Sequence, residues 1–264
     1  MTASDPCFIS AGRSHYHSHV EPHGNMIELD NASVLFADLV GYTAASTRAL
    51  PTETMRLLDS LYKTFDQITT DLKAYKLDTI GGEWRRRLCR LLDRAASLTS
   101  PVRAAPDAYM CATGLSFMNQ PDHVDRLLLL GAELIKAASL FSYPGMHTPV
   151  AIRVGMATGA VASGILGTIR RKYTITGSVV NMASRMESGG TPGFLHVSAE
   201  VMEASRIPRH LFERVVSHVK GMGEVTTYLL SVKDAELAES FLGTGGATRR
   251  LSAPGGHTPT PAGK

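Results

Sequence analysis

The chain has 264 residues, of which 44% are hydrophobic, and a formal net charge of +3 at pH 7. This length and apolar content suffice for one full-sized core with loose ends, so we expect a single domain. No apolar run reaches the roughly 20 residues of a membrane helix, and the N-terminus has no apolar signal segment, so we expect neither in this chain.

The basic excess is confined to one segment. Residues 82–106 contain six arginines and only two acidic side chains, so the rest of the chain has no positive excess. A nucleic-acid partner is therefore not expected. The cysteines, Cys7, Cys89 and Cys111, have neither paired nor metal-ligand spacing. They favour a reducing, cytoplasmic setting, either for this chain or for a larger, membrane-associated protein of which it is the cytosolic part.

Both ends of the chain lack the patterns of a folded unit. Residues 1–28 mix His, Ser, Pro and Gly without a period, and the last residues are rich in Gly, Thr and Pro. Such compositions are typical of flexible segments. We therefore predict a disordered tail at 1–28, a folded domain at 29–232 and a flexible tail at 233–264.

The elements predicted in the first half follow a recognisable order. An apolar, β-branched strand at Val34–Leu39 precedes a helix that begins at Thr52 and has apolar residues at helical spacing. Next come strands near 74–80 and from Tyr109, a helix at 123–140 and a strand at 151–157. This β-α-β-β-α-β order predicts an α+β fold with a ferredoxin-like core, in which two helices cover one face of an antiparallel sheet.

Further elements are predicted after this core. They are a short strand at 171–176, a helix at 178–187, and strands at 194–197, near 212–216 and at 225–230. Many unrelated functions use a ferredoxin-like core, so the order of elements does not indicate a chemistry.

A carboxylate ends the first apolar strand. Asp38 follows Val34–Ala37 and stands shortly before Gly41. Burying an unpaired carboxylate costs several kcal/mol, so such a group usually has a cationic partner. Asp38 is therefore a candidate cation ligand, and a turn or helix-capping residue is the alternative.

Five segments taken in order resemble the class III nucleotidyl cyclases, closest to the eukaryotic guanylyl cyclase branch. They are VLFADLVGYTAAS, LPTETMRLLDSLYKTFD, YKLDTIG followed later by DAYMCATGL, RVGMATGAVASGILG, and RRKYTITGSVVNMASRMES, with VKGMGEVTTYLL as a sixth. The similarity runs from about Ser33 to Leu230. It implies the class III cyclase fold, with additional C-terminal strands and helices, and an enzyme that cyclises a nucleoside triphosphate and releases pyrophosphate.

The resemblance assigns ligands and catalytic groups. Asp38 and Asp107, with the backbone carbonyl of Leu39, correspond to the ligands of two divalent cations, Mg²⁺ or Mn²⁺, which prefer oxygen donors. Asn181 and Arg185 correspond to the N-x-x-x-R element, in which Asn orients the ribose and Arg stabilises charge on the reacting phosphate. Four residues apart on a helix, they share one face, and without the resemblance they would be interpreted as solvent-facing.

Three further positions match substrate-binding residues. Lys220 corresponds to the lysine that meets the terminal phosphates, although Met222 stands where the family usually has a second lysine. Asp78 and Thr174 correspond to the two readers of the purine. Asp78 can accept from guanine N1–H and the 2-amino group, but would face a lone pair on adenine N1. This favours GTP and a cGMP product, while the Thr174 hydroxyl, which donates or accepts, suits either base.

An insertion interrupts one of these motifs. In the family the strand ends in T-I-G-D and continues into A-Y-M, whereas here residues 82–106 separate Gly81 from Asp107. One explanation is a translated intron, since Gly82-Glu83-Trp84 can be written with a GTGAGT donor and Pro106-Asp107 with a CAG acceptor. The other is a genuine surface insertion, which loop-closure entropy tolerates at small cost.

Active sites of this family form between two domains, one giving the aspartates and base readers and the other giving Asn and Arg. This chain has both sets, so the resemblance implies a homodimer, or a heterodimer with another cyclase domain. Two alternatives remain: an adenylyl cyclase on the same scaffold, and an inactive cyclase homology domain that acts as a dimerisation or regulatory partner.

Overall fold

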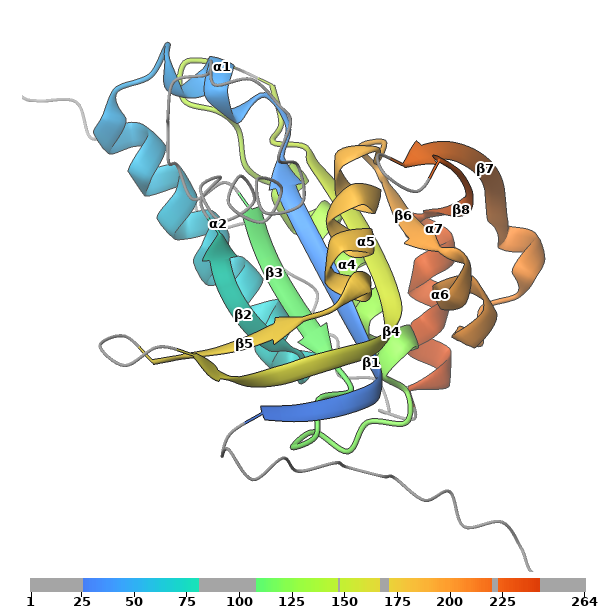
Figure 1. The fold of residues 1–264 in the computed structure, drawn as a ribbon. Coiled ribbons are helices and arrows are strands. Elements are labelled where there is room, and N and C mark those ends of the chain that lie inside the picture. The colour runs from blue at the N-terminus through green and yellow to red at the C-terminus, as the bar shows by residue number, and fades with distance from the viewer. Residues whose placement is uncertain (1–25, 81–107, 147, 167–170, 220–222, 243–264) are drawn as a thin grey trace, which may run out of the picture.

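The computed structural model describes residues 26–80, 108–146, 148–166, 171–219 and 223–242 (Figure 1). Its strands are β1 (Met26–Leu39), β2 (Tyr75–Ile80), β3 (Ala108–Thr113), β4 (Ile152–Leu166), β5 (Lys172–Thr176), β6 (Phe194–Ser198), β7 (Phe212–Val219) and β8 (Gly223–Ser231). Its helices are α1 (Tyr42–Ser46), α2 (Pro51–Asp71), α4 (His123–Ser139), α5 (Ser178–Ser188), α6 (Ala199–Ala204) and α7 (Val232–Ala235), with 3-10 helices η1 (Arg209–Leu211) and η2 (Glu236–Phe241). None of these helices is long and apolar enough to cross a membrane.

The described strands form one mixed sheet. Its order is β2-β3-β1-β4-β6-β8-β7, and β5 pairs with β4 at the side. The pairs β2–β3, β3–β1 and β1–β4 are antiparallel, whereas β4 and β6 are parallel. The predicted ferredoxin-like core is therefore confirmed, with strands longer than expected: β1 begins at Met26 rather than Val34, and β4 continues to Leu166.

Helix α2 begins where its sequence predicts. Pro51 occupies its first turn, and the Glu53 carboxylate accepts a hydrogen bond from the Leu50 amide at 3.1 Å. Proline suits this position because the first amides of a helix have no intrahelical acceptor. The buried face of α2 lies against α4 and the sheet, and includes Leu61 and Phe65.

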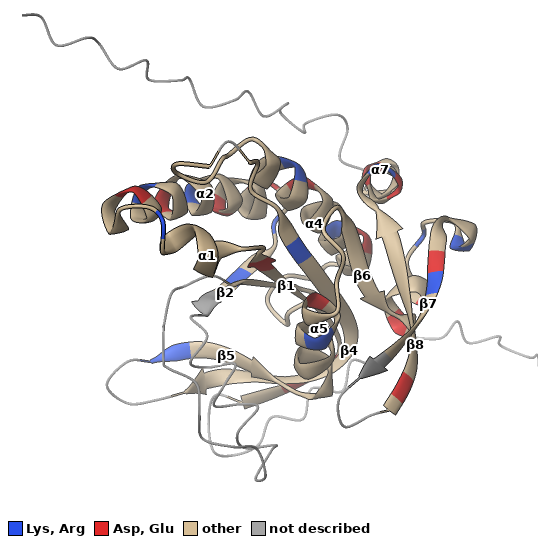
Figure 2. Cartoon of the chain, turned by 90° about the horizontal axis from the view of Figure 1, so that it is seen from above, with Lys and Arg blue, Asp and Glu red and all other residues tan. Residues whose placement is uncertain are grey.

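The two faces of the sheet carry separate apolar clusters. Helices α2 and α4 cover one face, and α5 lies on the other (Figures 1 and 2). Along β1, Leu35 and Ala37 belong to the cluster with α2 and α4, while Val34 belongs to the cluster with α5. Side chains alternate along a strand, so Asp38 falls on the α5 face.

The folded unit extends beyond the predicted limit at residue 232. Helices α7 and η2 pack against α4, with Ala235 and Ala238 fully buried and Leu242 only 7% exposed. The prediction of a flexible tail at 233–264 is thus wrong for residues 233–242. The apolar residues of this segment recur at near-helical spacing, and its two alanines occupy buried positions.

Helix α5 touches the sheet backbone directly at one glycine. A Cβ atom placed on Gly155 of β4 would lie 1.9 Å from the Glu187 nitrogen and 2.5 Å from the Ala183 oxygen. No side chain fits in that space, so Gly155 sets how closely the helix approaches β4.

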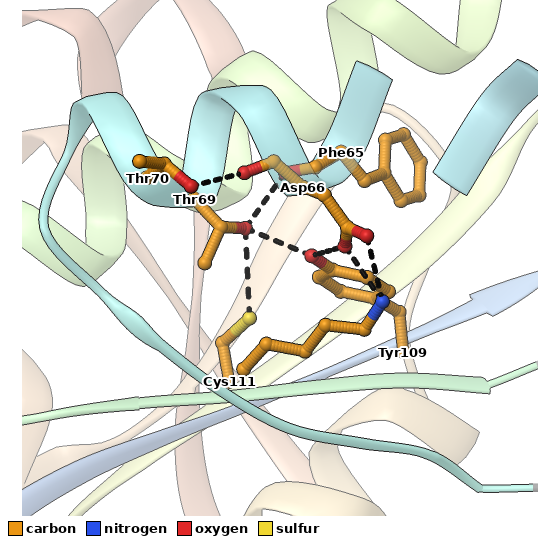
Figure 3. A network of polar contacts seen from close by, with 7 residues as sticks. Phe65, Asp66, Thr69, Thr70, Tyr109 and Cys111 are labelled. Carbon is orange, nitrogen blue, oxygen red and sulfur yellow. Dashed lines mark hydrogen bonds and ion pairs between the residues drawn. The ribbon is translucent and has the colours of Figure 1, made fainter. Parts of the chain in front are cut away.

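A polar network joins the β2–β3 pair to α2 (Figure 3). The Lys76 ammonium contacts the two carboxylate oxygens of Asp66 at 2.7 and 2.9 Å, and the Tyr109 hydroxyl donates to the same carboxylate at 2.6 Å. Thr69 Oγ1 lies 3.0 Å from the Tyr109 hydroxyl and 3.7 Å from Cys111 Sγ. Burial raises the pKa of the Cys111 thiol to about 12. The network fixes two strands of the sheet to one helix.

Replacing Gly155 with alanine should push α5 away from β4. We expect Gly155→Ala to lower the free energy of unfolding by about 3 kcal/mol, the upper range for overpacking in a well-packed region. Urea denaturation measures this. Gly189→Ala is the control, because a Cβ at Gly189 would meet its neighbours only at 3.5 Å and beyond. Equal stability of the two variants would contradict the close contact.

The raised pKa of Cys111 predicts a loss of stability in alkali. The thiol stays protonated in the folded chain but ionises above about pH 9 once unfolded, so its stabilising contribution is full below pH 9 and is lost as the pH rises toward 12. Between pH 8 and 10.5 the wild type should lose about 2 kcal/mol more than Cys111→Ser. Urea denaturation across this range measures the difference, and parallel curves for the two proteins would contradict it.

Candidate active site

Asp38 lies at the point where β1 ends and the chain turns. The residue is 9% exposed and is opposite Ala108 of β3 and Arg153 of β4. Leu39 is the last paired residue of the strand, and Gly41 follows with a φ angle of +75°. Glycine adopts this left-handed conformation without strain, which lets the chain turn into α1.

Two hydrogen bonds at Val40 stabilise the turn after Asp38. The Tyr143 hydroxyl donates to the Val40 carbonyl at 2.7 Å, and the Val40 amide donates to the Ala151 carbonyl at 2.9 Å. Burial, followed by the negative charge of Asp38, raises the pKa of Tyr143 to about 12. Tyr143 therefore remains a hydrogen-bond donor to the turn at physiological pH.

Arg153 lies between two carboxylates. Its Nη2 atom is 2.8 Å from Asp38 Oδ2 and 3.0 Å from Glu187 Oε1. The side chains of Asp38 and Glu187 are 12% and 3% exposed, and that of Arg153 is 30% exposed. Sequence reasoning missed Arg153 and Glu187, because the strand register and helix packing that bring them together are not local properties.

Asn181 and Arg185 lie on the outward side of α5. The inward side is formed by other residues, namely Val179, Val180, Ala183, Met186 and Glu187. Asn181 and Arg185 are each partly exposed, and neither side chain has a hydrogen bond or ion pair to another described residue. The predicted shared helix face is confirmed, and both side chains are available to a group outside the described chain.

A β-bulge sets the register of Asp78. The pairing of β2 with β3 shifts at Leu77, so Asp78 is opposite Met110 instead of Tyr109. Met110 belongs to the cluster on the α5 face, whereas Tyr109 belongs to the cluster under α2. The bulge therefore moves register position 78 to the sheet face that also carries Asp38.

Of the remaining predicted site residues, the structure describes Thr174 but not Asp107 or Lys220. Thr174 is on β5, opposite Gly164, and is partly exposed. Asp107 and Lys220 lie outside the described residues, as does the interrupting segment 82–106. Ala108, which directly follows Asp107, is opposite Asp38 in the sheet. Among the described side chains, no three His, Cys, Asp or Glu residues form a group suited to a metal.

The chain matches a family model in two segments. Residues 25–89 and 83–232 correspond to the adenylate and guanylate cyclase catalytic domain. The two segments meet in the region that interrupts the predicted motif. Together they span the sheet, α5 and the positions discussed above.

Curated relatives of both activities are similar to this chain. It is 32% identical over 236 residues to guanylate cyclase 2G of Rattus norvegicus, covering 87% of this chain and 18% of the relative. It is 34% identical over 212 residues to an adenylate cyclase of Mycobacterium bovis, covering 80% of this chain and 42% of the relative. The chain thus spans less than half the length of these relatives.

Solved structures agree with these similarities. The guanylate cyclase domain of RhGC from Catenaria anguillulae, in complex with GTP, is 26% identical with a TM-score of 0.62, covering 77% of this chain and 97% of that one. The adenylyl cyclase CyaB from P. aeruginosa shares the fold at 20% identity, with a TM-score of 0.59 and coverage of 77% and 94%. This chain belongs to the family of adenylate and guanylate cyclase catalytic domains.

Proposed function

We propose that this domain is a guanylyl cyclase, which converts GTP to 3′,5′-cyclic GMP and pyrophosphate with two divalent cations at a homodimer interface. The observation that carries the proposal is the convergence of the predicted residues on one sheet face. That face has Asp38, the register position of Asp78, and the helix with Asn181 and Arg185.

The donor set near Asp38 fits hard divalent cations. Asp38 and Asp107 would supply carboxylate oxygens and Leu39 a backbone carbonyl, and such donors suit Mg²⁺ or Mn²⁺. Asp38 Oδ2 accepts from Arg153, while Oδ1 has no hydrogen-bond partner among the described residues. When bound, the cations would acidify the ribose 3′-hydroxyl and neutralise triphosphate charge. The aspartates would hold these cations in fixed positions beside the reacting groups.

Base selection rests on Asp78 and Thr174. A carboxylate at position 78 would accept two hydrogen bonds from guanine, and the β-bulge brings this position to the face of Asp38. The similarity to a cyclase domain in complex with GTP supports the same choice. The adenylate cyclase relative makes ATP the second candidate, and the Thr174 hydroxyl suits either base.

In a dimer, the outer side of α5 would face the other subunit. Asn181 and Arg185 point away from their own sheet, so in a homodimer they would serve the site of the other subunit. The same side of the molecule exposes apolar Phe117, at 59%, beside the rings of Tyr75 and Tyr173. An exposed aromatic group of this kind fits a protein contact.

The fold does not need residues 82–106. Ile80 and Ala108 are directly paired, so the ends of β2 and β3 are already adjacent. Without 82–106, Gly81 and Asp107 would form a two-residue connection, which is the commonest hairpin length, and glycine first suits a type II′ turn. This supports the view that the segment is an addition to a complete domain, whether a translated intron or a surface insertion.

The first test compares the chain as given with a form that lacks 82–106. We expect the shortened form to make cGMP in preference to cAMP with Mn²⁺ or Mg²⁺, because a two-residue hairpin of Gly81 and Asp107 would place Asp107 directly beside the paired ends of β2 and β3. Asp38→Asn should lower kcat by at least about 100-fold through loss of a cation ligand. Asp59→Asn, an exposed change on α2, is the control. Dimers without turnover in either form would favour the regulatory-partner alternative.

The second test addresses the base. Asp78→Lys should lower the ratio of kcat/KM for GTP to that for ATP by at least about tenfold, because a lysine donates where guanine also donates. Initial rates with each nucleotide give the ratio. An unchanged ratio would remove Asp78 from base selection.

A further inference from the structure

Arg153 and Glu187 form a charge group with Asp38, and the proposed reaction assigns no role to either Arg153 or Glu187. The three side chains come from three elements, β1, β4 and α5, and meet at a single guanidinium nitrogen. With two carboxylates and one guanidinium, these three side chains together have a formal charge of −1. A nearly buried site with an excess negative charge attracts a cation more strongly than a balanced pair would.

The position of Glu187 determines how much of the Arg153 charge acts on Asp38. Glu187 Oε1 lies 3.0 Å from the same Nη2 atom that contacts Asp38 at 2.8 Å. A lone arginine beside Asp38 would cancel its charge and repel a divalent cation. With Glu187 on its other side, Arg153 can orient one oxygen of Asp38 while the attraction for a cation remains.

We propose that Arg153 and Glu187 are positioning residues for the cation site at Asp38: Arg153 fixes the orientation of the carboxylate, and Glu187 compensates the charge that Arg153 brings. This inference rests on the proposed role of Asp38 as a cation ligand. Because Glu187 follows Arg185 on α5, the charge group also joins the cation site to the helix that carries the predicted phosphate-binding arginine.

The proposal predicts opposite effects from two substitutions. Glu187→Gln brings the net charge of the group to zero and should weaken Mn²⁺ binding about tenfold. Arg153→Gln brings it to −2 and should strengthen binding by a similar factor, while the metal-free protein becomes less stable because two carboxylates then repel each other. A merely structural role would weaken binding in both variants.

The experiment measures Mn²⁺ affinity of the full chain without nucleotide, by electron paramagnetic resonance of the free ion, together with the thermal midpoint with and without Mn²⁺. The double variant Arg153→Gln/Glu187→Gln restores the charge of −1 and should bind Mn²⁺ nearly as the wild type does. The midpoint of Arg153→Gln should rise more on adding Mn²⁺ than that of the wild type.

Glu133→Gln is a matched control. Lys136 likewise lies between two carboxylates, 2.7 Å from Glu133 and 2.5 Å from Glu236, but on α4 at the opposite face of the sheet. The Mn²⁺ affinity of the Glu133→Gln variant should equal that of the wild type.

The outcomes separate the inference from the proposed function. Equal Mn²⁺ binding by wild type and Asp38→Asn would overturn the cation site and the inference together. Binding that depends on Asp38, but is unchanged or weakened in both single variants, would overturn the inference alone. Opposite shifts, with recovery in the double variant, would support both.

Discussion

The contact between α5 and β4 at Gly155 is the constraint on which the site depends. Because the strand has no side chain there, the backbones of helix and sheet touch, and no adjustment of side chains can take up an error in the helix position. This places Glu187 beside Arg153, and Arg153 is paired across the sheet with Asp38. The geometry of the candidate active site is therefore set by backbone packing more than by the polar groups themselves.

The second constraint is the alternation of side chains between the two faces of the sheet, which decides the face on which each residue of a strand lies. Strict alternation places Asp38 on the α5 face, whereas position 78 reaches that face only because β2 contains a bulge at Leu77. On the opposite face, Lys76 and Tyr109 bind Asp66 of α2 and keep the strand pair in register (Figure 3). Strand β2 thus stabilises the fold through Lys76 and carries the candidate base-reading residue at position 78.

The sequence patterns predicted the secondary-structure elements of the core, but they did not predict the side-chain contacts between those elements. The β-α-β-β-α-β order follows from local periodicity and turn residues, so it was predictable, as was the shared helix face of Asn181 and Arg185. The ion pairs of Arg153 depend on strand register and on a close helix approach, which link distant parts of the chain. The buried segment 233–242 was missed because two of its buried residues, Ala235 and Ala238, are alanines, which give only a weak hydrophobic signal.

Helix α5 carries candidate functional residues on both its inner and its outer side, so it could connect the cation site to the nucleotide site. Its inner side contacts the charge group of its own subunit through Glu187, and its outer side presents Asn181 and Arg185. In a homodimer of the proposed kind, the same rigid helix would touch the cation site of one subunit and the nucleotide of the other. If cation binding shifts α5, the affinity for the nucleotide would change, and by reciprocity the nucleotide would change the affinity for the cation by the same factor.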